Sequence, residues 1–427
     1  MNDMTVPKIP ISPVLAPVDF PQAAAPAAPA DSRVAFAAGR PAFRRLVLRG
    51  AFLELVTAGF YRFWLATDMR RHLWSHTTVE GDAPEYVGTA KQLLVGFLFA
   101  VAILVPINGG YFWLGLEAER VQAFASVPLG LFYYVFLQFA IYRSRRFRMT
   151  RTVWRGVRFS MTGSGLNYAW RVGLWSLLVF ISLGFALPWR QAALERFKMR
   201  YTSYGNLQGG FEGTGSGLFK QGWWLWLVCW GLVALPVLAI VQHVRHHGST
   251  GLEKLAAVLL LAFCVQVLLA PFIYARYKSI EWRWWASGIR SGDVRFSSDL
   301  RPGAFVGLYW KVIGWSCLLF LGLTIWMSAT FGIGFSLVGG AGTVEQKMLM
   351  LSQHWGLMAA VAVGYVAFIL AFWAVVRIYL IHDVWQRVAQ SVTVHNLAAA
   401  SEVAAQQGEL AGAIGEGLAD SLDVVGF

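Results

Sequence analysis

Glu54, Arg171 and Lys311 each lie within an apolar run of the sequence. Ionisable groups are costly inside a membrane, so such residues are candidates for function. Their chemistry suits anion binding or a solute pathway. The simpler interpretations are that Glu54 faces interfacial water and that the two cations snorkel to lipid headgroups. Arg45 and Arg49 are candidate partners of Glu54, but neither has the favourable spacing of four residues.

His72 and His76 are four residues apart, which places two imidazoles on one face of a helix, as in a two-histidine metal site. The positions 125 residues later hold Phe197 and Tyr201, which favours aromatic packing instead. The chain also lacks a P-loop lysine and a serine nucleophile motif. We therefore predict no metal, no cofactor, no catalytic residue and no enzymatic activity.

The composition places these charges in an integral membrane protein. Of 427 residues, 57% are hydrophobic and 14% are charged, with a net charge of +13. Several apolar runs reach the roughly 20 residues that a membrane-spanning helix needs. The basic residues lie in short loops between these runs, which indicates membrane topology and anionic lipid rather than nucleic acid. The predicted fold class is an all-α polytopic membrane protein.

An internal repeat positions the candidate residues. An offset of 125 residues aligns Gly59 with Gly184, Trp64 with Trp189 and Arg71 with Arg196, without a gap. A third copy follows from matching residues 169–180 with 309–320, where Arg171 faces Lys311. Each copy predicts a strand, an apolar helix and a basic helix, and the first two copies add a small β-hairpin.

The repeat and the end compositions divide the chain into five parts. They are a disordered Ala/Pro-rich tail (1–33), three repeats with two spans each (34–142, 143–276 and 277–396), and an acidic Ala-rich tail (397–427).

The motif "GFYRFWLATDMRRHLWSHT", its second copy at 184–214 and the tail "GEGLADSLDVVGF" resemble the YjgN-like bacterial inner-membrane proteins. This is a domain family of unknown function. Its members usually have a proline before the motif tryptophan; the second copy keeps Pro188 before Trp189, whereas the first has Phe63. The resemblance implies an inner-membrane location and supplies no activity or substrate.

Six segments are predicted to span the membrane: 92–110, 121–142, 222–243, 252–276, 304–331 and 356–381. Two further segments, 45–66 and 166–189, are ambiguous. If both enter and leave by one face, most loop arginines and lysines gather on that face, as the positive-inside rule requires. We therefore favour six full spans plus two re-entrant or interfacial elements, with both termini in the cytoplasm; eight full spans is the alternative.

The basic helices would then lie at the cytoplasmic headgroup level. Their cations are candidate lipid-headgroup ligands: Arg70, Arg71, Arg196, Lys198 and Arg200. Anionic membrane lipids are the predicted partners. Two functions remain open: a transporter or channel-like protein for a small solute, as repeats with broken helices suggest, or a non-transporting protein that organises anionic lipid or recruits partners through its basic face.

Overall fold

The computed structural model describes residues 31–119, 126–247, 252–338 and 354–400. The two predicted tails lie almost entirely outside these residues. At the N-terminal side the boundary of the predicted tail is wrong, because Asp31–Arg33 already forms strand β1 and pairs with the last strand.

The described chain is mostly helical. Its helices are α1 (Arg40–Val56), α2 (Arg62–Ser75), α3 (Ala90–Glu119), α4 (Ser126–Thr150), α5 (Gly165–Ile181), α6 (Leu187–Arg200), α7 (Gly215–His247), α8 (Leu252–Gly288), α9 (Val306–Val338), α11 (Trp355–Val376) and α12 (Asp383–Gln390). A π-helical turn, η1 (Arg377–His382), joins α11 to α12, and a short 3₁₀ helix, η2 (Leu397–Ala400), ends the described chain. Five helical segments within the described residues are long and apolar enough to cross a membrane: Ala90–Gly115, Gly215–His246, Glu253–Gly288, Val306–Ser336 and Trp355–Gln390.

Of the sixth predicted span, residues 121–142, the structure describes residues 126–142; they belong to α4, which is not among these five segments. Four arginines occupy the last part of α4, at positions 143, 145, 146 and 148. They leave residues 126–142 as the apolar part that the structure describes. The count of six full spans is therefore not supported.

Neither ambiguous segment is a candidate span. Helices α1 and α5 are both followed by a tight turn and by a helix that packs back against them. Both helices end in the same way: Gly59 N–H donates to the Glu54 carbonyl at 2.7 Å, and Gly184 N–H donates to the Val179 carbonyl at 2.8 Å. These bonds across five residues are typical of a Schellman C-cap. The segments thus form two helical hairpins.

Each hairpin turn depends on a glycine with a left-handed backbone. Gly59 has φ of +89° and Gly184 has φ of +91°, and no atom lies near the position of an added Cβ. We expect Gly59→Leu and Gly184→Leu each to cost about 1–3 kcal/mol through backbone strain alone. Thermal unfolding of the purified variants tests this. Gly173→Leu is the control, because Gly173 lies in α5 with open space and no positive φ; unfolding temperatures equal to that of the parent at both turns would disprove the expectation.

The strands form one long antiparallel sheet and a small second one. They are β2 (Ala35–Phe36), β3 (Thr77–Thr78), β4 (Glu85–Tyr86), β5 (Thr152–Trp154), β6 (Val157–Met161), β7 (Thr202–Tyr204), β8 (Leu207–Phe211), β9 (Ile289–Ser291), β10 (Val294–Ser298) and β11 (Val392–His395), together with β1. The nine-stranded order is β1-β11-β10-β9-β8-β7-β6-β5-β4, and β2 pairs with β3.

This sheet corrects the prediction of small separate hairpins. The segment 202–214 does contain the predicted hairpin β7–β8. The matching segment 77–89 does not, because β3 pairs with β2 and β4 pairs with β5. Isolated hairpins leave unpaired edges, and the neighbouring hairpins of this chain pair edge to edge instead.

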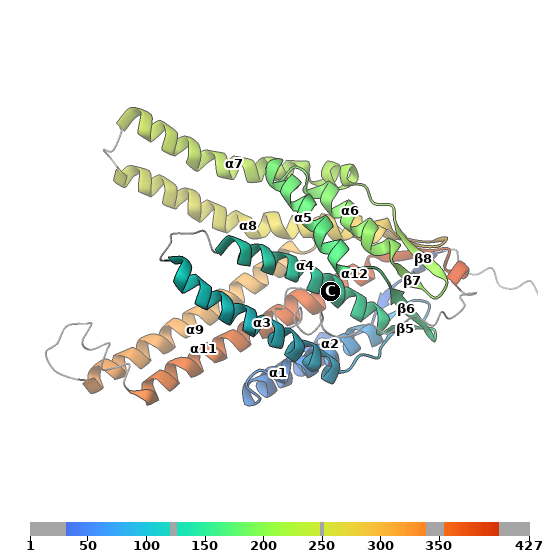
Figure 1. Ribbon diagram of the computed structural model, residues 1–427, viewed down its shortest axis with the longest axis horizontal. Helices are drawn as coiled ribbons and strands as arrows, with labels where there is room; N and C mark the ends of the chain where they lie inside the picture. Colours follow the sequence, from blue (N-terminus) through green and yellow to red (C-terminus); the bar gives the residue numbers. More distant parts are fainter. Residues whose placement is uncertain (1–30, 120–125, 248–251, 339–353, 401–427) are drawn as a thin grey trace, which may run out of the picture.

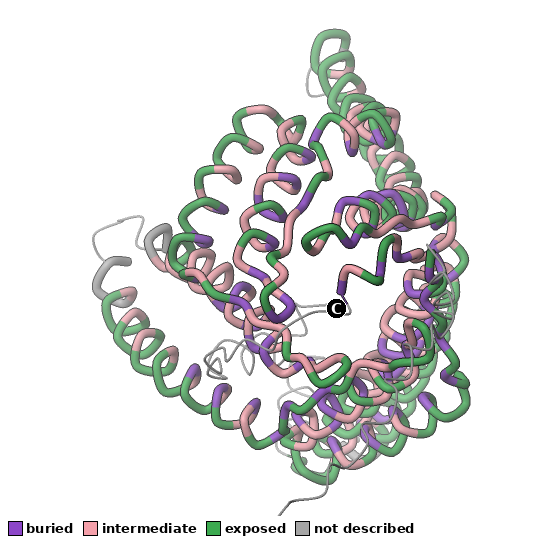
Figure 2. The backbone as a smooth tube through the Cα atoms, turned by 90° about the vertical axis from the view of Figure 1, so that its right-hand side faces the viewer, coloured by how far each residue is buried: buried purple, intermediate pink, exposed green. Residues whose placement is uncertain are grey.

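The helices follow one another around a ring. Helix α1 packs against α2, and α2 packs against α3. Helices α3 and α4 meet through Ala100 and Ala140. From α4 to α9 each helix contacts the next, α9 contacts α11, and α11 closes the ring by packing against α1. Figure 2 shows the resulting ring from the sheet end. Figure 1 shows the longest helices extending away from the sheet, which gathers at the opposite end. Unpaired strand edges are not tolerated in lipid, so the sheet end must lie outside the bilayer.

Candidate functional site

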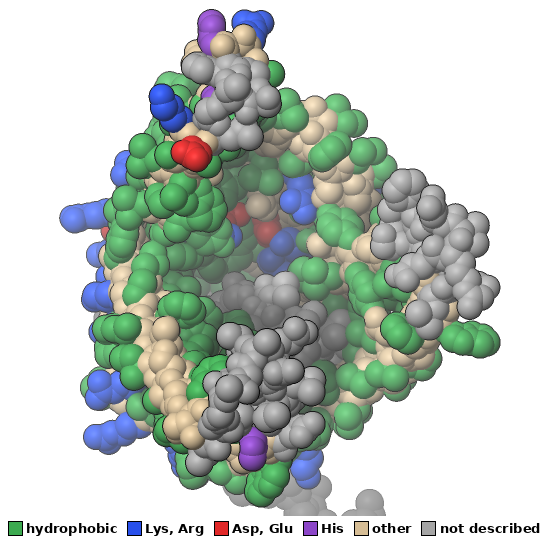
Figure 3. All heavy atoms as spheres, turned by 90° about the vertical axis from the view of Figure 1, so that its left-hand side faces the viewer, with side chains coloured by type: hydrophobic (Ala, Val, Ile, Leu, Met, Phe, Trp, Pro, Cys, Tyr) green, Lys and Arg blue, Asp and Glu red, His purple; other side chains and the backbone are tan. Residues whose placement is uncertain are grey.

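The end of the molecule opposite the sheet is hollowed. Figure 3 shows hydrophobic side chains around the hollow, with Lys, Arg, Asp and Glu side chains visible on its floor. In four of the five candidate spans no more than 6% of the most apolar stretch is buried. The spans therefore present apolar side chains on nearly all sides instead of packing into a closed bundle.

Buried charges gather where α4, α6 and α8 approach the sheet. Glu195 of α6 accepts a hydrogen bond from Arg145 of α4 at 3.3 Å and one from the Trp285 indole at 3.1 Å, and it also pairs with Lys198. On α8, Lys278 pairs with Glu281 at 2.7 Å. We call these residues, together with Arg190, the floor cluster: Arg145, Arg190, Glu195, Lys198, Lys278 and Glu281.

The floor cluster is one electrostatic unit with more basic than acidic side chains. Glu281 acts on Lys198 across the gap between α8 and α6, and Arg190 and Glu281 both act on Tyr277. Burial would raise the pKa of the Glu195 carboxyl, but Lys198 and Arg145 outweigh it and hold that pKa below its usual value. Burial also lowers the pKa of the Lys198 amine, against the pull of Glu195.

Several cations near the cluster have unused donors. The Nε atoms of Arg143, Arg145 and Arg190 are buried and have no hydrogen-bond partner among the described residues. Buried polar nitrogens are normally hydrogen-bonded. The protein therefore encloses these three donors without giving them a partner among the described residues.

Glu54 has a partner that sequence spacing did not identify. Both of its carboxylate oxygens accept hydrogen bonds from Arg377, each at 3.0 Å, and both side chains are at most 8% exposed. Neither Arg45 nor Arg49 forms this pair. The contact joins α1 to the π-helical turn after α11, so it fastens the first helix of the ring to the last.

The structure does not join Glu54 to the two other charges predicted for a pathway. Arg171 is exposed on α5, with its guanidinium 5.1 Å from the centre of the Phe197 ring. Lys311 is exposed on α9. No hydrogen bond or ion pair in the described part of the chain connects Glu54, Arg171 and Lys311.

The five predicted headgroup ligands occupy three different environments. Arg70 is buried against Tyr86, and Lys198 belongs to the floor cluster. Arg71 and Arg196 are exposed and donate to the carbonyls of Gly88 and Gly213, at 3.0 and 3.2 Å. Arg200 is also exposed. These residues therefore do not form the single exposed basic face that the sequence suggested.

The basic helix α2 is likewise not a surface element. Half of it is buried, including Phe63, Leu65, Met69 and Leu73. The motif tryptophans take similar places at the starts of the returning helices: Trp64 stacks on Tyr61 and packs beside Phe63, Ala90 and Phe147, and Trp189, which follows Pro188 in the first turn of α6, lies against Phe219.

His72 of α2 and His76, which directly follows that helix, lie beside an aromatic core. Their rings are 4.3 Å apart, and Phe43 contacts both His72 and His382. His382 is fully buried and its Nδ1 lies 2.9 Å from Asp383 Oδ1. Among the described residues no group of three or more potential ligands could hold a metal ion.

This packing predicts a pH dependence of stability. Burial, with smaller contributions from His76 and His382, lowers the pKa of His72 below its ordinary value near 6.5. Below that pH the unfolded chain binds a proton that folded His72 resists, so stability falls as the pH falls. We expect a lower unfolding temperature at pH 5 than at pH 7.5, with a smaller difference in His72→Phe. His354→Gln, at an exposed site, is the control; an unchanged difference in His72→Phe contradicts the account.

The site residues missed from the sequence are Arg145, Arg190, Glu195, Lys278, Glu281 and Arg377. Glu195 and Glu281 are two of the few carboxylates beside aromatic and apolar runs. Their rarity there is the sequence signal that could have marked them as site residues. The pairs Glu195–Lys198 and Lys278–Glu281 have the helical i,i+3 spacing and could have been found from the sequence, whereas Arg145 and Arg377 come from helices far from their partners in sequence.

The long apolar helices, which expose nonpolar side chains on most of their surface, define a polytopic membrane protein. Residues 31–421 match the family described as bacterial protein of unknown function (DUF898), and the chain belongs to that family. This agrees with the resemblance to YjgN-like proteins. Comparisons with curated proteins and with solved structures found no match.

Proposed function

We propose that the protein binds and organises anionic lipid, with acyl chains in the hollow and a phosphate-bearing headgroup at the floor cluster. The observation that carries the proposal is an apolar hollow with charged side chains on its floor (Figure 3). We assign these side chains to the floor cluster, in which four basic side chains meet two carboxylates. A water-filled pathway needs polar walls, whereas here exposed apolar side chains surround the hollow.

The floor cluster has the chemistry that a phosphate group requires. Arginine and lysine form strong charge-assisted hydrogen bonds to phosphate oxygens, and an anionic surface attracts each nearby cation by about 1 kcal/mol.

The proposal includes a location and an orientation. Membership of a bacterial family and the apolar helices support the inner membrane. The sheet end carries the basic loops, so the positive-inside rule favours the cytoplasm for that end and for both chain termini. We propose no catalytic role.

The proposal also includes the internal repeat. Its support is a set of matching contacts 125 residues apart: Arg71 to Gly88 and Arg196 to Gly213, as well as the two positive-φ glycines in the hairpin turns. In the third copy, β10 leads into α9 as β6 leads into α5. Three related units in a ring would explain why the hollow lies at the centre.

Lipid retention tests the function. Arg190→Gln/Lys198→Gln removes two floor cations, and at about 1 kcal/mol each this should weaken the binding of anionic lipid by about thirtyfold, measured by native mass spectrometry of the lipid that co-purifies. The control Arg71→Gln/Arg158→Gln removes two exposed cations outside the cluster. Equal retention in both variants, with unfolding temperatures like that of the parent, would refute the proposal.

Transport of a small solute is the second candidate function, because the hollow ends at charged side chains (Figure 3). It requires a route through the floor. Solute flux into vesicles that is lost in Arg190→Gln/Lys198→Gln would favour transport over lipid organisation.

A further inference from the structure

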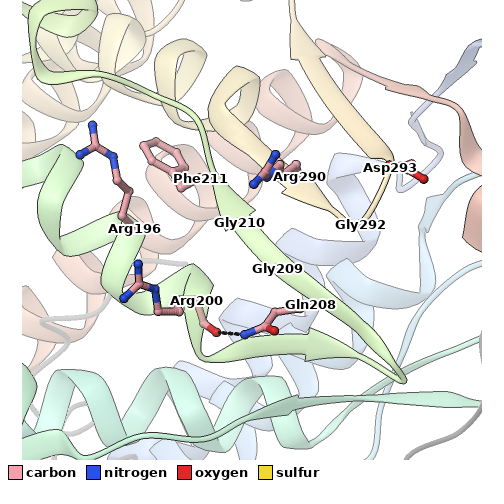
Figure 4. Close-up of a pocket in the computed structure, with 9 residues that line it drawn as sticks. All are labelled: Arg196, Arg200, Gln208, Gly209, Gly210, Phe211, Arg290, Gly292 and Asp293. Atoms are coloured by element: carbon pink, nitrogen blue, oxygen red, sulfur yellow. Dashed lines mark hydrogen bonds between the residues drawn. The ribbon is translucent and has the colours of Figure 1, made fainter.

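A second basic site lies on the other side of α6. Glu195 and Lys198 of that helix belong to the floor cluster, whereas Arg196 and Arg200, one turn apart, project from a different face. They border a pocket of about 600 Å³ together with β8 and Arg290 of β9. Figure 4 shows these three arginines flanking β8, with the Asp293 side chain directed away from them.

Two glycines in β8 give the pocket its shape. Gly210 is the register partner of Arg290, and a Cβ at Gly210 would lie 2.5 Å from Arg290 Nε. A Cβ at Gly209 would lie 2.8 Å from the carbonyl oxygens of Met199 and Thr202. The glycine pair therefore lets the Arg290 side chain lie across the strand and lets the strand approach the end of α6.

The arginines keep donors available for a ligand. Arg196 donates to the Gly213 carbonyl at 3.2 Å, and Arg290 donates to Glu212 at 2.9 Å in a pair whose side chains are both about half exposed. Exposed pairs of this kind contribute at most about 1 kcal/mol, so a stronger anion can displace Glu212. Arg200 forms no side-chain hydrogen bond or ion pair with any described residue, and each guanidinium has five N–H donors.

We propose that this pocket binds a ligand carrying two or more phosphate groups. Three guanidinium groups around one pocket match the planar, bidentate recognition of phosphate oxygens, and about 600 Å³ lies within the usual size of small-molecule sites. The phosphates could belong to a soluble compound or to a lipid headgroup. This site is separate from the floor cluster and does not depend on lipid in the hollow.

Inorganic pyrophosphate is the first probe, titrated calorimetrically into the full-length protein in neutral detergent. We expect binding that Arg200→Gln weakens by about tenfold or more, the usual loss for a charged hydrogen bond. Gly210→Val should also weaken pyrophosphate binding, because the valine side chain would occupy the space of the Arg290 side chain. Arg158→Gln, an exposed arginine on β6 of the same sheet, should leave the affinity unchanged.

Neutral nanodiscs with and without cardiolipin, a lipid with two phosphate groups, form the second arm. Pyrophosphate binding with the expected variant pattern assigns a soluble ligand. Binding of lipid alone, weakened by Arg200→Gln but not by Arg158→Gln, assigns a headgroup. The proposal is overturned if neither probe binds, or if Arg200→Gln and Arg158→Gln have equal effects in variants that unfold like the parent.

Discussion

Glu54→Gln is expected to lower the free energy of unfolding by about 3–5 kcal/mol, because it leaves the Arg377 guanidinium buried without its counter-charge. The pair is bidentate and almost completely enclosed, so water cannot readily replace the carboxylate. Since the pair joins α1 to the end of α11, the loss should loosen the closure of the helix ring. Thermal unfolding in detergent should show a decrease of about 3–6 °C.

The double variant Glu54→Leu/Arg377→Met tests whether the loss of stability in Glu54→Gln comes from the unpaired buried charge or from the lost contact between α1 and the end of α11. Replacing both partners of a buried ion pair by apolar residues is often nearly neutral, so most of the stability should return. Asp299→Asn is the control, because it breaks an ion pair with Arg33 whose side chains are 65% and 68% exposed and should cost less than about 1 kcal/mol. A Glu54→Gln protein as stable as Asp299→Asn contradicts this role for the pair.

Cysteine labelling should give an all-or-none result for the orientation of the sheet. In a background without Cys229, Cys264 and Cys317, Asn206→Cys and Asp293→Cys place single exposed thiols on the sheet. If the sheet faces the cytoplasm, as the positive-inside rule favours, an impermeant reagent added to intact cells should not label them. Both should react after the membrane is permeabilised.

Arg245→Cys and Lys254→Cys are the matched positions at the other end of the molecule. Both residues are exposed, and they lie at the ends of α7 and α8 farthest from the sheet (Figure 1). They should react in intact cells. Labelling of Asn206→Cys together with protection of Lys254→Cys would reverse the proposed orientation.

Local sequence signals predicted much of the secondary structure. Apolar runs located the long helices, and alternation located the strands at 157 and 294, which the structure has as β6 and β10. Gly59 and Gly184 marked the hairpin turns because few other residues adopt a positive φ. The long sheet was not predicted. Strands β8 and β9, for example, pair although helices of 33 and 37 residues separate them in the chain, and no local sequence pattern specifies such a partner.

The candidate site was predicted less well, for the same reason. Glu54 was recognised as unusual, but its partner Arg377 lies 323 positions away. Lys198 was grouped with Arg196 and Arg200 because all three are basic and adjacent in sequence. The helical period separates them, so that Lys198 pairs with Glu195 in the interior while the two arginines face the pocket beside β8.

The central claim is that lipid occupies the hollow, and an electron cryomicroscopy map of the protein in nanodiscs containing anionic phospholipid tests it most directly. The account predicts acyl-chain density between the apolar helices, with a headgroup phosphate within hydrogen-bonding distance of Arg190 or Lys198. A hollow without lipid density, or a continuous water-lined path that crosses the floor cluster, would contradict it.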